Sequence, residues 1–271
     1  MNAVDRHSVS FDLPAARVRK LDYCIASTPH SGSKLLSEAL WESGSAGAPG
    51  EYFKRGPMGS FANRWSVGTI DAYVRALRRH RTTRGGVFAF SANYHQFEDQ
   101  IGADLMESHF AAIRPIFFRR RDVLGQAVAW AQAAQLDPNR PAEEREDSPR
   151  FDAEQIEKLV DQIFFEEQGW RDYFDSISTT PHEVFYEDLV EDFAGTVRTA
   201  FEFLGLEAPE QIECPVGLGA LSQTSQLWTW RFRKSAGRPS RPAAAPATSS
   251  QKVVALPPPI QLQTWRAERQ A

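Results

Sequence analysis

Short apolar runs alternate with polar turns and amphipathic stretches over most of the chain. The run LDYCIAS at residues 21–27 breaks into the polar turn TPHSGS at residues 28–33. Apolar residues then recur at helical spacing over residues 35–40. The pattern predicts a strand, a tight loop and a helix, which is the opening unit expected of a parallel α/β sheet.

Three further apolar runs predict three more strands, at residues 87–90, 115–118 and 183–185. The first two are short and apolar, as strands covered on both faces of a sheet are, and the third is a shorter strand that begins with Glu183. Helices are predicted over residues 123–135 and, after the last strand, through residues 195–204. Strands that alternate with helices in this way predict an α/β fold, with a doubly wound, mostly parallel central sheet flanked by helices.

Other segments lack this alternation and set the domain organisation. Residues 137–151, DPNRPAEEREDSPRF, are charged and contain proline, which indicates a loop or lid. From residue 235 the chain has too little periodic apolar content to pack a core, so residues 235–271 are predicted to be a low-complexity, flexible tail. We therefore expect an N-terminal extension at residues 1–20 and one domain over residues 21–234.

Composition and charge exclude several classes of protein. The formal net charge of -4 lacks the basic excess typical of nucleic-acid or membrane-surface binders. The two cysteines, Cys24 and Cys214, form neither a disulfide framework nor a zinc motif, so no metal is expected and a reducing compartment is indicated. No signal-peptide-like or membrane-spanning run stands out, which predicts a cytoplasmic protein without membrane attachment. The sequence leaves a homodimer open.

The first loop is the strongest candidate for binding chemistry. Gly32 lies between two serines at the start of a predicted helix, where backbone N–H groups and the helix dipole can hold an anion. An ordinary helix capped by Ser33 would give the same short pattern. A Walker A loop would need G-x-x-x-x-G-K-[ST], but Thr28 stands at its first glycine and Lys34 follows Ser33 instead of Gly32. Nucleoside-triphosphate hydrolysis is therefore disfavoured.

Five blocks of sequence together resemble a known family. YCIASTPHSGSKLLSEALWESGSAGAPGEYF is similar to the first motif of bacterial sulfotransferases of the trehalose sulfotransferase-like family. FFRRRDVLGQAVAWAQA, EEQGWRDYF, YEDLVEDFAGTVRTAFEFLG and SQLWTWRFRK resemble later segments of the same family, in the family's order. The resemblance covers roughly residues 21–234 and implies a P-loop-like sulfotransferase fold.

The resemblance also implies a reaction. A sulfotransferase of this family would take a sulfuryl group from 3′-phosphoadenosine 5′-phosphosulfate, release adenosine 3′,5′-bisphosphate and need no metal. The acceptor would be a hydroxyl on a small molecule, such as a carbohydrate or a natural product. Transfer of this kind resembles phosphoryl transfer, in which the protein mainly positions groups in line and stabilises charge on the departing oxygen.

By the same resemblance, the first loop would bind the 5′-phosphosulfate. The N–H groups of Ser31, Gly32, Ser33 and Lys34 would surround it, and His30 would occupy the basic position and donate a hydrogen bond to the leaving phosphate. His30 stands where Lys or Arg is usual in the family, and Lys34 where Thr or Ser is usual. A solvated loop histidine is the alternative role for His30.

The second and last blocks would supply the rest of the donor site. Arg120 matches the family arginine for the 3′-phosphate, a group that suits the rigid fork of arginine. Gln126, on the next helix, could add a polar contact, while Arg119 and Arg121 are more readily explained as ion-paired surface residues. Arg231 and Arg233 would belong to a flap over the nucleotide, or else to an exposed basic helix end.

The reaction also needs a group that receives the proton of the acceptor hydroxyl. Glu51, in APGEYF, matches the family glutamate proposed for this role and would lie at the carboxyl edge of the sheet, where active sites of open α/β sheets form. His95, in SANYHQF, is the rival base, because the strand before it should end at the same edge. Ser91 stands where the family commonly has a lysine.

Two other classes of function stay open at this point. A nucleotide-dependent kinase or other phosphotransferase would use the same loop, but the chain shows neither a Walker lysine nor a magnesium-binding aspartate in register. A non-catalytic nucleotide-binding scaffold would keep the fold while losing the reacting groups, and the departures at His30, Lys34 and Ser91 fit that alternative.

Overall fold

A computed structural model describes residues 8–13, 19–136, 148–214 and 222–236. They fall into two compact units. The described part of the first unit lies within residues 8–121 and 163–214, and that of the second within residues 122–162 and 222–236. The two units are described separately below.

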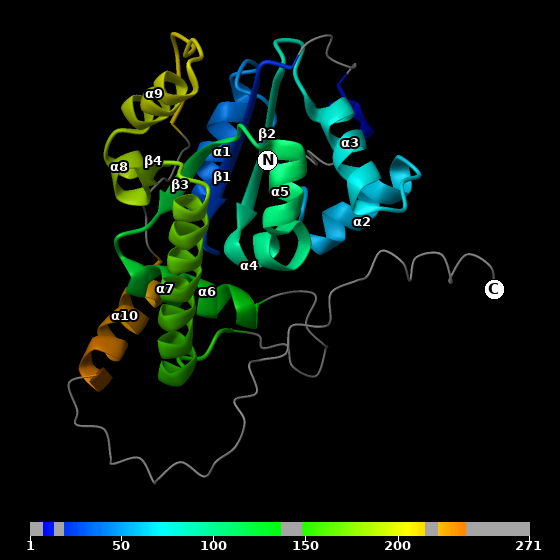
Figure 1. The fold of residues 1–271 in the computed structure, drawn as a ribbon. Coiled ribbons are helices and arrows are strands. Elements are labelled where there is room, and N and C mark those ends of the chain that lie inside the picture. Colours follow the sequence, from blue (N-terminus) through cyan, green and yellow to red (C-terminus); the bar gives the residue numbers. More distant parts are fainter. Residues whose placement is uncertain (1–7, 14–18, 137–147, 215–221, 237–271) are drawn as a thin grey trace, which may run out of the picture. The chain divides into compact units, whose positions relative to one another are not determined.

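The first unit contains a sheet of four parallel strands (Figure 1). The strands are β1 (Leu21–Ser27), β2 (Val87–Asn93), β3 (Arg114–Arg119) and β4 (His182–Phe185), in the spatial order β2-β1-β3-β4. Because all four run in the same direction, their carboxyl ends meet at one edge of the sheet, where Ser27 lies beside Asn93. This edge is where a site in an open α/β sheet is expected.

All four predicted strands are present, and three of them extend beyond the predicted residues. β1 matches the apolar run at residues 21–27, and β3 and β4 extend their runs by only one or two residues. β2 continues three residues beyond its apolar run, through Ser91, Ala92 and Asn93. These residues stay extended because they pair with Ile25–Ser27 of β1, a tertiary contact that periodicity does not reveal.

Helices of the first unit cover both faces of the sheet and connect its strands (Figure 1). Their bounds are α1 (Ser33–Glu42), α2 (Arg55–Arg64), α3 (Ile70–Arg81), α4 (Tyr94–Gln96), α5 (Gly102–Phe110), α8 (Tyr186–Glu191) and α9 (Phe193–Leu204), with a π-helical turn at Phe97–Ile101 and a 3₁₀ turn at Val9–Phe11. The long helix α7 (Ala153–Ser176) begins in the second unit and belongs to the first from Ile163. This is the doubly wound arrangement that the sequence predicts.

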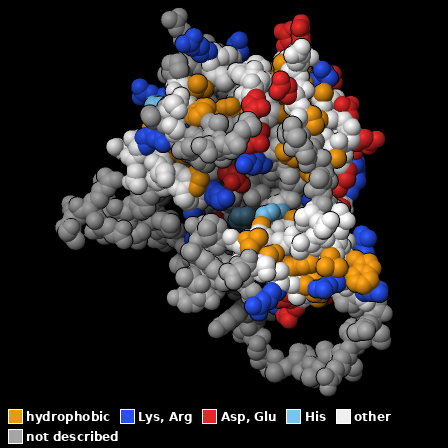
Figure 2. Space-filling view, turned by 180° about the vertical axis from the view of Figure 1, so that it is seen from behind, with side chains coloured by type: hydrophobic (Ala, Val, Ile, Leu, Met, Phe, Trp, Pro, Cys, Tyr) orange, Lys and Arg blue, Asp and Glu red, His pale blue; other side chains and the backbone are white. Residues whose placement is uncertain are grey.

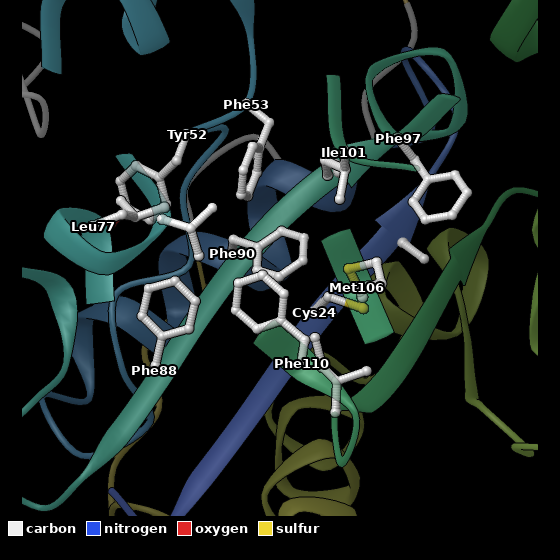
Figure 3. Packing of buried hydrophobic residues seen from close by; sticks show 14 of the residues in the cluster. Cys24, Tyr52, Phe53, Leu77, Phe88, Phe90, Phe97, Ile101, Met106 and Phe110 are labelled. Carbon is white, nitrogen blue, oxygen red and sulfur yellow. The ribbon is translucent and has the colours of Figure 1, made fainter. Parts of the chain in front are cut away.

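Two apolar cores flank the sheet. On one face, Phe88, Phe90 and Phe117 pack with residues of α2, α3, α5 and α7, and part of this aromatic cluster is drawn in Figure 3. On the other face, Ile25 and Ile116 pack with residues of α1, α8 and α9. Burial of large apolar side chains stabilises such units by about 1.5–3 kcal/mol per side chain, so the two cores fix the sheet edge on which the site is built.

The second unit contains α6 (Val123–Gln135), α10 (Gln223–Ala236) and the start of α7. The Asp122 carboxylate accepts a hydrogen bond from the Gly125 N–H (3.0 Å) and caps α6, whose bounds are those predicted from the sequence. Trp228 is buried and packs edge-on against Phe151. The Ser225 hydroxyl donates to Gln132 Oε1 at 2.9 Å, which joins α10 to α6.

Two of the segments without periodic pattern lie largely outside the described residues. They are the predicted loop, of which residues 137–147 are not described, and the predicted tail beyond residue 236. Part of the N-terminal extension is described and packs on the first unit: the Phe11 ring lies edge-on to Trp41, and the Asp12 carboxylate accepts from Trp65 Nε1 (3.0 Å) and from the buried Arg81 (2.9 Å).

The surface carries charges of both signs. In the face drawn in Figure 2, basic and acidic side chains occur across the described surface, and no single sign covers it. None of the described helices combines the length and the apolar character needed to cross a membrane.

Candidate functional site

The loop between β1 and α1 has the backbone of an anion-binding turn. Gly32 precedes the first residue of α1 with a left-handed φ of 99°, and Leu35 N–H donates to its carbonyl at 3.0 Å. A Cβ at Gly32 would lie 2.5 Å from Cδ2 of Tyr186, so only glycine fits. Since glycine has no side chain with which to cap α1, the N-terminal N–H groups of this helix can turn toward a ligand.

Buried hydroxyl groups line the same loop. Ser31 is fully buried, and its hydroxyl forms no hydrogen bond with any described residue. Ser33 Oγ donates to Ser27 Oγ at 3.1 Å, and Ser27 Oγ donates in turn to Asn93 Oδ1 at 3.0 Å. A buried donor without a partner is costly, so the Ser31 hydroxyl fits a loop that holds a phosphate or sulfate oxygen.

His30, in the same loop, lies near two charged residues of the segment that contains Glu51. Desolvation by burial lowers the pKa of the His30 imidazole; Lys54 lowers it further, and Glu51 acts in the opposite sense. His30 also has a positive φ of 59°, which is uncommon for a residue other than glycine. The predicted residues Glu51 and His30 are therefore close enough for their charges to interact.

The loop that carries Glu51 is anchored on both sides. Before Glu51, the Gly50 carbonyl accepts from the Ser91 N–H of β2 at 3.0 Å. After it, the Tyr52 carbonyl accepts from the Tyr73 hydroxyl at 2.7 Å, and both of these tyrosines are fully buried. The Glu51 side chain itself is 43% exposed and lies 3.5 Å from Lys54 Nζ. The backbone thus fixes where Glu51 stands, while its carboxylate faces solvent.

The three arginines after β3 have different surroundings. Arg119 pairs with Glu167 (Nε to Oε2, 3.0 Å) and Glu183, and Arg121 binds Asp188 through two nitrogens at 2.5 and 2.8 Å. The expectation that these two arginines form ion pairs is met. Arg120 between them is buried, with Cζ 4.7 Å from the centroid of the Tyr186 ring.

Tyr186 connects two parts of the candidate site. The same ring packs against Gly32 in the first loop and under the Arg120 guanidinium. It lies at the start of α8, in the block YEDLVEDF, to which the sequence alone assigned no role for an individual residue. The ring therefore places the predicted 3′-phosphate arginine next to the predicted 5′-phosphosulfate loop.

His95 also has an ionisable partner. It lies in α4, directly after β2, and its Nδ1 is 3.3 Å from Oε1 of Glu166 in α7. The His95 side chain is 32% exposed, whereas that of Glu166 is 1% exposed. The sequence does not suggest Glu166, because 71 residues separate it from His95 and no local spacing links the two.

The remaining predicted residues have other surroundings. Lys34 is 83% exposed, and its Nζ lies 3.7 Å from Oε1 of Glu38 in the same helix. Gln126 is in the first turn of α6, and Arg231 and Arg233 are exposed residues of α10, all in the second unit. The Arg231 guanidinium lies over the Phe151 ring at 5.8 Å.

The chemistry of the site is that of an anion-binding site with flanking acid and base groups. The first unit brings together the loop at residues 30–33, Arg120, Tyr186 and Glu51. Among the described residues, no group of three or more His, Cys, Asp or Glu side chains is placed to hold a metal ion. Asn93, Tyr186 and Glu166 are the residues that sequence reasoning missed, since each acts through a contact distant in the sequence.

Most of the chain matches a known protein family. Residues 22–235 match the family described as Stf0 sulphotransferase. The chain is similar to trehalose 2-sulfotransferase of Mycobacterium tuberculosis, with 26% identity over 80% of this chain and 96% of the relative. It is similar in the same degree to trehalose 2-sulfotransferase of Mycolicibacterium smegmatis, with 26% identity over 81% of this chain and 97% of the relative.

Solved structures give more distant likenesses. One is the sulfotransferase domain from the curacin biosynthetic pathway, with a TM-score of 0.47 and 13% identity over 80% of this chain and 99% of that one. Another is mouse sulfotransferase SULT7A1 complexed with PAP, with a TM-score of 0.43 and 16% identity over 83% of this chain and 69% of that one.

Proposed function

Because this chain belongs to the Stf0 sulphotransferase family, we propose that it transfers a sulfuryl group from 3′-phosphoadenosine 5′-phosphosulfate to a hydroxyl of a small acceptor molecule. The observation that carries the proposal is the loop at Gly32. Its left-handed glycine, uncapped helix start and buried Ser31 hydroxyl suit a phosphosulfate. The Tyr186 ring lies against both this loop and Arg120.

In the proposed reaction, the acceptor oxygen forms a bond to sulfur while the bond from sulfur to the phosphate oxygen breaks. The electron pair of the broken bond stays on the phosphate, which leaves as part of adenosine 3′,5′-bisphosphate. The N–H groups of Ser31 to Lys34 and the Ser31 hydroxyl would bind the charged oxygens, and His30 would donate a hydrogen bond to the leaving oxygen. Arg120 would bind the 3′-phosphate through its guanidinium fork.

By the family resemblance, Gln126, Arg231 and Arg233 would also contribute to donor binding. Gln126 would add a polar contact from α6, and the two arginines of α10 would belong to the flap that the family resemblance implies. These assignments rest on the sequence match, and they belong to the proposal together with the donor itself.

Glu51 is the proposed acceptor of the hydroxyl proton, with His95 as the rival base. The loop that holds Glu51 is tied to β2 by the hydrogen bond from Ser91 N–H to the Gly50 carbonyl, so its carboxylate stands at the carboxyl edge of the sheet. The relatives named as trehalose 2-sulfotransferases make a carbohydrate the first acceptor class to try.

Calorimetric titration with nucleotides tests the proposed donor against the phosphotransferase alternative. A sulfotransferase should bind adenosine 3′,5′-bisphosphate in the presence of EDTA and prefer it to ATP. Preference for ATP, with binding that depends on Mg²⁺, would favour a kinase. An absence of binding by either nucleotide would contradict both.

A further inference from the structure

His95 stands close to the donor loop through the end of β2. Asn93 is the last residue of β2, and its Oδ1 accepts from Ser27 Oγ, which itself accepts from Ser33 at the start of α1. His95 follows two residues later. Its position along the chain therefore puts it at the same edge of the sheet as the loop that would hold the sulfuryl donor.

Glu166 determines which nitrogen of His95 carries the proton. A carboxylate oxygen accepts hydrogen bonds, so the contact from His95 Nδ1 to Glu166 Oε1 (3.3 Å) favours the tautomer that carries its proton on Nδ1. The lone pair is then on Nε2, to which no described residue donates a hydrogen bond. A half-buried imidazole in this tautomer can accept a hydrogen bond from a hydroxyl group.

Contacts of α4 with α7 hold the pair in place. The Asn93 N–H donates a hydrogen bond to Gln96 Oε1 (3.2 Å), which caps the single turn of α4. Next to His95, the Tyr94 ring packs edge-on against Trp170 of α7, and a Cβ at Gly169 would clash with Tyr94. Trp170 in turn donates from Nε1 to the Ser27 carbonyl at 2.8 Å. α4 and α7 are thus locked together at the donor loop.

The charge around the pair indicates the kind of molecule that it would bind. Desolvation raises the pKa of the neighbouring Tyr94 hydroxyl, and the carboxylates of Glu98, Asp172 and Glu166 raise it further. Three carboxylates therefore lie near the Tyr94 hydroxyl, next in sequence to His95, and disfavour an anionic ligand there. A neutral molecule with several hydroxyl groups matches both the lone pair on Nε2 and these charges.

We propose that His95 Nε2 accepts a hydrogen bond from a hydroxyl of the sulfuryl acceptor, and that Glu166 is the positioning residue that presents His95 for this contact. The proposal rests on the proposed function and assigns the acceptor subsite within it. The hydroxyl bound here is one that is not sulfated, since Glu51 receives the proton of the reacting hydroxyl.

Kinetics test the proposal by separating acceptor binding from turnover. The probe is whichever polyhydroxy compound the wild-type chain sulfates best in a panel that begins with trehalose. Glu166→Gln should raise the KM for this acceptor about tenfold, the scale of one lost hydrogen bond. kcat at saturating acceptor and the Kd of adenosine 3′,5′-bisphosphate should change less than threefold, roughly half a kcal/mol.

Glu167→Gln is the matched control. It makes the same chemical change one residue along α7, at a carboxylate that is equally buried but pairs with Arg119. Its acceptor KM should equal that of the wild type even if its melting temperature falls. His95→Ala, at a partly exposed side chain, should reproduce the effect of Glu166→Gln, and the double variant should be no worse than either single variant.

A second measurement needs no acceptor. Long-range ¹H–¹⁵N NMR spectra should show the proton of neutral His95 on Nδ1 in the wild type and in Glu167→Gln, and a loss of that preference in Glu166→Gln. An unchanged acceptor KM in Glu166→Gln, additive effects in the double variant, or a His95 proton on Nε2 would each overturn the proposal. A wild-type chain that sulfates nothing in the panel would instead contradict the proposed function.

Discussion

The Arg120 guanidinium lies buried over the Tyr186 ring, so its removal should lower the affinity for a nucleotide that carries a 3′-phosphate. Arg120→Ala should weaken binding of adenosine 3′,5′-bisphosphate by roughly 1.5–3 kcal/mol, the scale of hydrogen bonds to a charged group. Binding of adenosine 5′-phosphate should barely change in calorimetry. Arg121→Ala is the control, since that side chain is exposed and paired with Asp188. Equal losses for both nucleotides would mean that Arg120 does not bind the 3′-phosphate.

The carboxylate of Glu51 is the residue whose loss should affect the chemical step. Help from a general base contributes about 10²–10⁴-fold, so Glu51→Gln should lower the single-turnover rate by that factor and leave donor affinity nearly intact. His95→Asn should cost less than about tenfold in the same assay. Glu38→Gln, at a carboxylate paired with Lys34, is the matched control. A larger loss of single-turnover rate in His95→Asn than in Glu51→Gln would identify His95 as the base.

His30 should couple donor binding to pH. Desolvation, with Lys54, lowers its pKa in the free protein, and a bound phosphate would raise it, because a nearby anion favours the charged imidazole. Binding should therefore take up a proton, and affinity for adenosine 3′,5′-bisphosphate should fall as the pH rises from about 6 to 8. The phosphate titrates in this range as well, so the difference from His30→Asn is the quantity to measure. Identical pH profiles for the two proteins would remove His30 from the leaving-group contact.

At the scale of elements, the loop between β1 and α1 depends on one glycine. Gly32→Ala combines a φ of 99° with a Cβ only 2.5 Å from Tyr186, so both the loop and the ring beneath Arg120 must move. Strain of this kind costs about 1–3 kcal/mol of stability, and nucleotide binding should be lost with it. Gly56→Ala in α2 meets no atom within 4 Å and should be neutral or stabilising by about 0.5–1 kcal/mol. Thermal melts and titration of both variants check this contrast.

The elements themselves were largely predictable from the sequence, because strands buried on both faces leave apolar runs that a local pattern can reveal. β1 and α6 have the bounds that the pattern predicts. The last three residues of β2 are different, since Ser91 and Asn93 are polar and are extended only through pairing with β1. Elements whose conformation comes from a neighbouring strand leave no periodic signal in their own sequence.

The site was predictable to the extent that its residues lie in local motifs. Gly32 and Arg120 follow the ends of strands, where position along the chain already indicates an edge of the sheet. The partners of these residues were not predictable in this way. Tyr186 is 154 residues from Gly32 in the sequence, and only the fold brings the two together. The buried Glu166 beside His95 was missed for the same reason.

For the whole molecule, the family match and the candidate site support the same proposed reaction. The match spans residues 22–235 and includes both the donor loop at β1 and the arginines of α10. With a formal net charge of -4, affinity for the proposed, highly charged donor would have to come from the local groups around Gly32 and Arg120 and not from the overall field of the protein.

Transfer of a labelled sulfuryl group tests this account most directly. The chain would be incubated with 3′-phosphoadenosine 5′-[³⁵S]phosphosulfate, EDTA and a panel of hydroxyl acceptors that begins with trehalose. We expect a labelled sulfate ester and an equal amount of adenosine 3′,5′-bisphosphate. The single-turnover rate should be strongly reduced in Glu51→Gln. Tight binding of the donor without transfer to any acceptor, or transfer of a phosphoryl group from ATP that requires Mg²⁺, would contradict it.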